Sequence, residues 1–76
     1  MNHDKILKEY VDTDMALHEY IKDGNVNFDR YMELDLIRVI AESEYIKSLE
    51  IQGYSAPYGM KERNLRGLQR HNRETI

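Results

Sequence analysis

The segment from residue 28 to residue 52 is apolar on almost every side when it is drawn as an α-helix. One face carries Phe28, Met32, Leu36, Val39, Ile40 and Ile46. A second set spreads over most of the remaining circumference and comprises Tyr31, Leu34, Ile37, Ala41, Tyr45 and Leu49. A single neighbouring helix covers only one side of such a segment, so at least two partners must pack against it.

Residues 3 to 23 supply the first partner, because their apolar side chains recur at helical spacing along one face only. Asn2 is the expected N-cap of this helix, and Gly24 is the residue expected to end it. Asn27 is the corresponding cap of the second helix. Because the connection between the helices is short, they must be antiparallel neighbours. The sequence therefore predicts an all-α protein built on an antiparallel hairpin of residues 3–23 and 28–52.

The end of the chain has a different character. Residues 1 to 54 hold six Lys or Arg against twelve Asp or Glu, whereas residues 55 to 76 hold five against two. The stretch GYSAPYG reads as a turn and linker, and the residues after it have a helical pattern that Gly67 weakens. We assign residues 1–53 to the helical hairpin and 54–76 to a linker and basic C-terminal arm, helical in part.

The second partner of residues 28–52 is left open by the sequence: a second copy of the chain, the C-terminal arm or a foreign protein. A chain of 76 residues buries only about 60% of its surface on folding and usually needs added stabilisation. Cysteine is absent, which removes disulfides and thiolate metal sites. We therefore expect a homodimer that forms a helical bundle.

A location in the cytoplasm is expected for this chain. It has no apolar run of about 18 residues and no secretory signal pattern at its start. The same observations predict no association with membranes.

An arginine row is the most regular polar feature near the C-terminus. Arg63, Arg66, Arg70 and Arg73 lie within an arc of about 80° if this segment is helical. Guanidinium groups bind phosphate or carboxylate groups in a planar fork. The row has three interpretations: contact with nucleic acid, contact with an acidic protein surface, or pairing with the acidic residues of the protein's own hairpin.

Tyrosine is the dominant aromatic residue, with six copies beside one phenylalanine and no tryptophan. Large amphipathic rings are frequent at protein interfaces. Tyr45, Tyr54 and Tyr58 are the best interface candidates, and with the four arginines they make up the predicted partner-binding set.

Asp14 and His18 lie one helical turn apart at the edge of the apolar face, and the hairpin brings Asp35 towards them. Two carboxylates and an imidazole can bind a metal or act in acid–base catalysis. Polar clusters in helical bundles more often fix register. We therefore predict no metal, no cofactor and no catalytic residue.

The second helix contains Glu33, Leu34 and Asp35 in sequence. In this respect it resembles the sporulation aspartyl-phosphate phosphatases, helical hairpin proteins with a Ser-x-Glu-Leu-Asp motif on the second helix. The resemblance implies that Asp35 is a functional residue. The serine position of the motif is Tyr31 here, and the match covers only these few residues.

These features together favour a small regulatory or inhibitory protein-binding module, of the kind used by bacteria and their viruses, which binds a macromolecule without turnover. One alternative is a nucleic-acid-binding protein that uses the arginine row. Another is an acidic mimic of nucleic acid that binds through Asp12, Glu19 and Asp23. A phosphatase-like hairpin that uses Asp35 is the remaining alternative.

Overall fold

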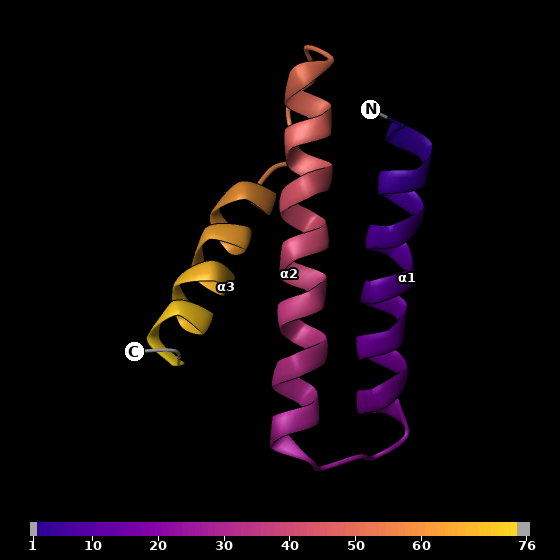
Figure 1. Ribbon diagram of the computed structural model, residues 1–76, viewed down its shortest axis with the longest axis vertical. Helices are drawn as coiled ribbons and strands as arrows, with labels where there is room; N and C mark the ends of the chain where they lie inside the picture. The colour runs from indigo at the N-terminus through magenta and orange to yellow at the C-terminus, as the bar shows by residue number, and fades with distance from the viewer. Residues whose placement is uncertain (1, 75–76) are drawn as a thin grey trace.

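The computed structural model describes the backbone of residues 2 to 74 and the side chains of residues 2 to 72. It contains three α-helices, α1 (His3–Lys22), α2 (Phe28–Ile51) and α3 (Met60–Glu74) (Figure 1). No strand occurs within the described part of the chain, so the predicted all-α class is confirmed. None of the described helices is long and apolar enough to cross a membrane.

The helices begin and end where local chemistry favours it. The Asn2 side chain accepts a hydrogen bond from the backbone N–H of Lys5 at 3.2 Å. Asn27 does the same for the backbone N–H of Arg30 at 3.0 Å. These bonds satisfy backbone donors that have no partner inside the helix. Just past the end of α1, Gly24 adopts a φ of 78°, a left-handed conformation that glycine reaches without strain.

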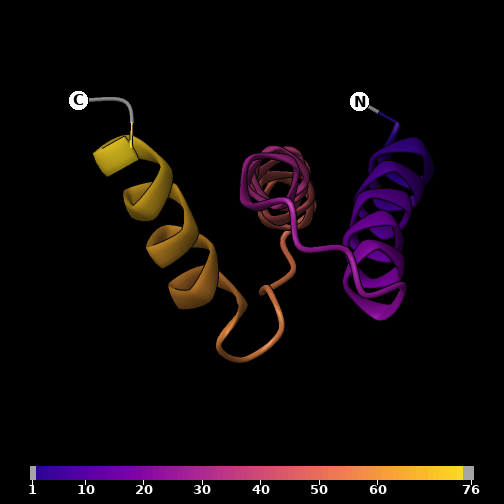
Figure 2. The same cartoon turned by 90° about the horizontal axis from the view of Figure 1, so that it is seen from below.

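The three helices lie side by side in a single layer, with α2 in the middle (Figures 1 and 2). Both α1 and α3 pack on α2, and the backbones of α1 and α3 do not come close to each other in the described part of the chain. The molecule measures 40 × 28 × 21 Å along its principal axes. No second layer covers α2 within the described part of the chain. Side chains of its neighbours nevertheless bury one face of α2, where Val39 and Glu42 are 0% exposed, whereas Ile37 and Ile40 on the opposite face are about half-exposed.

The apolar core is small as a result. Among the described residues only Leu17, Val39 and Ile46 are apolar and buried. The C-terminal segment supplies the second partner of α2, because α3 is helical and packed on it. Two features hold α3 on α2: a set of buried polar contacts, and one place where the two helices approach each other closely.

The close approach occurs at Gly67, in the middle of α3. A Cβ atom built on Gly67 would lie 2.8 Å from Cγ2 of Val39, and Val39 is completely buried on α2. The glycine that weakens the helical pattern in the sequence is therefore the residue that lets the two helices meet. Its cost in helix propensity is offset by the packing it permits.

We predict that Gly67→Ala destabilises the protein by about 1–2 kcal/mol, although alanine is the better helix former. The reason is the clash of the new methyl group with Val39. In a Val39→Ala background the same substitution should become neutral or stabilising. The free energy of unfolding of the four proteins, measured with urea, tests this. A destabilisation by Gly67→Ala that is equally large in both backgrounds would contradict the close approach.

A candidate binding groove lined by arginines

Two carboxylates of α2 are buried inside the protein. Asp35 and Glu42 are two helical turns apart and are only 2% and 0% exposed. Removing a charged carboxylate from water costs several kcal/mol unless donors on the protein replace the water. The neighbouring helices provide these donors.

Glu42 collects donors from all three helices. The Tyr10 hydroxyl of α1 donates to it at 2.6 Å, and the Asn64 amide of α3 donates at 3.1 Å. Arg63 of α3 and Arg38 of α2 complete the set at 3.3 and 3.4 Å. Burial, and then the hydrogen bond to Glu42, raise the pKa of Tyr10 to about 12. The tyrosine therefore stays a neutral donor.

Asp35 is held mainly by α3. Arg70 contacts its carboxylate at 2.6 Å, and Nε2 of His71 does so at 2.8 Å. Arg38 of α2 adds a third contact at 3.1 Å. Burial alone raises the pKa of Asp35, but the hydrogen bonds from His71, Arg38 and Arg70 outweigh this effect and leave the pKa below its ordinary value. Asp35 is thus a charged anchor for α3.

A signal for this docking is present in the sequence. Asp35 and Glu42 are seven residues apart, and so are Arg63 and Arg70. Equal spacings on two antiparallel helices align both charge pairs at once. Pairing with the hairpin is one of the three interpretations of the arginine row, and Arg63 and Arg70 pair in this way. The sequence pattern does not single out Glu42, Asn64 or His71, because polar residues on a helix are usually exposed.

The pairs at Asp35 and Glu42 form part of a groove of about 500 Å³ over α2. Its α3 wall is made by Arg63, Arg66, Gly67 and Arg70. Its α1 wall is made by Tyr10, Asp14, Leu17, His18 and Ile21. Tyr31, Asp35 and Arg38 of α2 lie between the walls. Two features that the sequence singled out separately, the arginine row and the Asp14–His18–Asp35 set, therefore meet in one place.

The arginines of the groove are not equivalent. Arg63 and Arg70 each pair with a buried carboxylate, yet their side chains remain 59% and 51% exposed. Arg66 is exposed and has no ion pair among the described residues. The side chain of Arg73 lies outside the described residues. We call the surface formed by Arg63, Arg66 and Arg70 together with the α1 wall the arginine groove.

Asp14 and His18 contact each other at 3.4 Å on the α1 wall. Asp35 lines the same groove, but its oxygens are taken up by Arg38, Arg70 and His71. Within the described residues no group of three acidic or histidine side chains is arranged to hold a metal ion. The carboxylate that the phosphatase resemblance would make functional is therefore enclosed by the protein's own donors.

None of the three candidate interface tyrosines lines the groove. Tyr45 is half-buried and stacks on Tyr10, with ring centres 5.3 Å apart, and on His3 at 5.7 Å. It therefore belongs to the packing of α1 on α2. Tyr54 and Tyr58 lie in the connection before α3 and are exposed.

Comparison with protein families, with curated proteins and with solved structures finds no match for this chain.

The buried hydrogen bonds and ion pairs around Glu42 predict different effects for substitution of Glu42 and of the nearby Glu44 on α2. Glu42→Gln should lower the free energy of unfolding by about 3 kcal/mol, because Arg63 then has no charged acceptor among the described residues and Arg38 keeps only Asp35. Glu44→Gln is the matched control, since Glu44 is exposed, and it should change stability by less than about 0.5 kcal/mol. Urea unfolding measures both. Equal effects of the two substitutions would contradict the network.

The lowered pKa of Asp35 predicts how stability depends on pH. A carboxyl group whose pKa is lower in the folded than in the unfolded state stabilises the protein above its unfolded pKa of 3.8. This contribution is lost as the pH falls through the folded pKa. The stability difference between wild type and Asp35→Asn should therefore be constant above about pH 5 and shrink towards about pH 2. Urea unfolding across this range measures it, and a difference independent of pH would refute the assignment.

Proposed function

We propose that the protein is a regulatory binding module without turnover, and that it recognises an acidic segment of a partner protein in the arginine groove. The observation that carries this proposal is the position of Arg66, an exposed guanidinium without an ion pair among the described residues, between two half-exposed arginines. A guanidinium offers several N–H donors in a plane and binds a carboxylate in a fork.

The docking of α3 supports this function by fixing the arginines in advance. Glu42 and Asp35 hold Arg63 and Arg70 at 3.3 and 2.6 Å. Side chains that are already ordered lose less entropy when a ligand binds. The acidic segment of the partner therefore binds to guanidinium donors that are already in position.

The opposite wall of the arginine groove supports a peptide in preference to a nucleic acid. Asp14 on this wall would repel a continuous chain of phosphates, and Asp35 and Glu42 neutralise part of the charge of the row. Ile21 is half-exposed on the same wall, next to Leu17. A segment with separate carboxylates and an apolar side chain fits this mixture of charge and apolar surface.

The proposed working form is a homodimer. The single helical layer supports it, because the arginine groove occupies one face and leaves the half-exposed Ile37 and Ile40 on the other face to the second copy. Burial in the dimer would provide the stabilisation that a chain of this length needs.

Binding is tested with a short fluorescent peptide that alternates Glu and Leu, and with its Gln-for-Glu analogue. We expect anisotropy to detect the acidic peptide and not the neutral one. Arg66→Ala should weaken binding by about tenfold, the loss of one charge-assisted hydrogen bond. Lys5→Ala is the matched control, because Lys5 is exposed on α1 and lines none of the hollows, so the loss of this positive charge should leave the affinity unchanged.

Two results would overturn the proposal. One is the absence of binding at millimolar peptide, or equal binding of the neutral analogue. The other is tighter binding of a single-stranded oligonucleotide, with a steep dependence on salt that Arg66→Ala flattens. The second result would replace the acidic segment with a nucleic acid as the ligand.

A further inference from the structure

The protein exposes more surface than a compact monomer of its mass. Its accessible area is 5758 Å², whereas folded monomers of 9.1 kDa expose about 4,900 Å². The excess is roughly 900 Å², and a standard interface buries about 800 Å² on each partner. The surplus area is therefore of the size that one copy contributes to a stable dimer.

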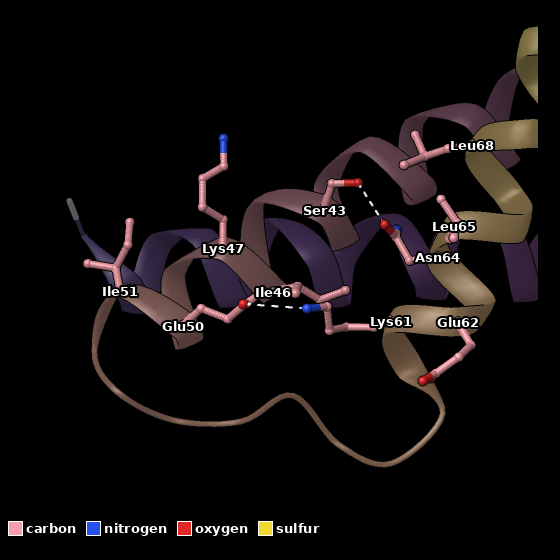
Figure 3. Close-up of a pocket in the computed structure, with 10 residues that line it drawn as sticks. All are labelled: Ser43, Ile46, Lys47, Glu50, Ile51, Lys61, Glu62, Asn64, Leu65 and Leu68. Atoms are coloured by element: carbon pink, nitrogen blue, oxygen red, sulfur yellow. Dashed lines mark hydrogen bonds and ion pairs between the residues drawn. The ribbon is translucent and has the colours of Figure 1, made fainter.

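Large apolar side chains gather on one face of the layer. We call this the apolar face and define it by Leu36, Ile37, Ile40 and Ile51 of α2 and Leu65 and Leu68 of α3. All of them are at least one-third exposed, and Ile51 reaches 66%. Figure 3 shows Leu65 and Leu68 beside α2, with Ile46 and Ile51 lining the same hollow. A second hollow lies on the α1 side of Ile37 and Ile40.

The apolar face and the arginine groove lie on opposite sides of the layer. On α2, Ile37 and Ile40 point roughly 140–160° away from Asp35 and Glu42, and Leu36 points roughly 100–120° away. On α3, Leu65 and Leu68 line one hollow, whereas the arginines line the other. A partner on the apolar face would therefore leave both walls of the arginine groove accessible.

Charge selects the arrangement of two copies. The α1 side of the apolar face is acidic, with Glu9, Asp12 and Glu44 around the hollow. The α3 side is neutral, because Lys47 and Lys61 balance the glutamates Glu50 and Glu62. Stacking α1 on α1 would oppose two acidic rims, whereas stacking α1 on the partner's α3 would place each acidic rim against a neutral one and avoid this repulsion.

We infer that two copies of this chain join through their apolar faces about a two-fold axis parallel to α2, with α1 of each copy against α3 of the other. The inference names the surface and arrangement of the homodimer, and so rests on that part of the proposed function. The dimer is a two-layer, six-helix bundle. Its arginine grooves face outwards on opposite sides, which makes the assembly bivalent for acidic segments.

The face is tested by substitution and light scattering. The wild type should be a dimer at micromolar concentration, and Ile40→Glu should convert it to a folded monomer. Met15→Glu is the matched control, because Met15 is 53% exposed on α1 but lines neither hollow of the apolar face. It should leave the dimer intact. Circular dichroism verifies that both variants fold.

The arrangement is tested with engineered cysteines, since the chain has none of its own. Glu9 and Leu65 lie at nearly the same level along α2, because their neighbours Tyr10 and Asn64 both contact Glu42. Oxidising a mixture of Glu9→Cys and Leu65→Cys proteins should give mixed disulfide dimers in large excess over Glu9→Cys self-pairs.

Each opposite outcome refutes a different statement. A wild type that is monomeric, or an Ile40→Glu variant that remains dimeric, refutes the apolar face as the interface. Predominant Glu9→Cys self-pairs refute the arrangement of α1 on α3. A monomeric wild type that still binds the acidic peptide would remove the dimer and leave the arginine groove as the binding site.

Discussion

The burial of two carboxylates in the middle helix is the constraint on which the rest of the structure depends. Glu42 is fully buried and takes donors from α1, α2 and α3. Asp35 takes donors from α2 and α3. Each charge is tolerated only when all of these donors are in place. Because the core contains few buried apolar residues, the hydrogen bonds and ion pairs around Asp35 and Glu42 determine where α1 and α3 lie.

Polar attachment of this kind specifies position more strongly than it adds stability. A slide of α3 by one turn would move Arg63 and Arg70 away from their carboxylates and would place a side chain other than Gly67 against Val39. Apolar packing alone allows such slides, because one leucine contact resembles another. The charge pairs and the glycine together select one register. The arginine groove has a defined shape for this reason.

Sequence reasoning was accurate where the signal is local. Helix ends follow from the Asn2 and Asn27 caps, and the all-α class follows from apolar periodicity. The docking of α3 depends instead on pairing between distant residues, which periodicity does not encode. Gly67 lowers the local helix propensity, but glycine is favoured at this position because a larger side chain would clash with Val39. For the site, the sequence pattern reveals the arginine row. It does not reveal that Asp35 and Glu42 are buried, because carboxylate side chains are usually exposed.

The helix α3 contributes to both surfaces of the protein, and this links them energetically. Its arginines form one wall of the arginine groove, and its leucines Leu65 and Leu68 form part of the apolar face. A ligand on either surface binds the docked state of α3 better than the undocked state, so it stabilises docking. By thermodynamic reciprocity, occupation of one surface then strengthens binding at the other. The strength of this coupling depends on how often α3 leaves α2 in the free protein. The buried carboxylates hold α3 on α2, so under the proposed function they would set that frequency and with it the coupling between the two surfaces.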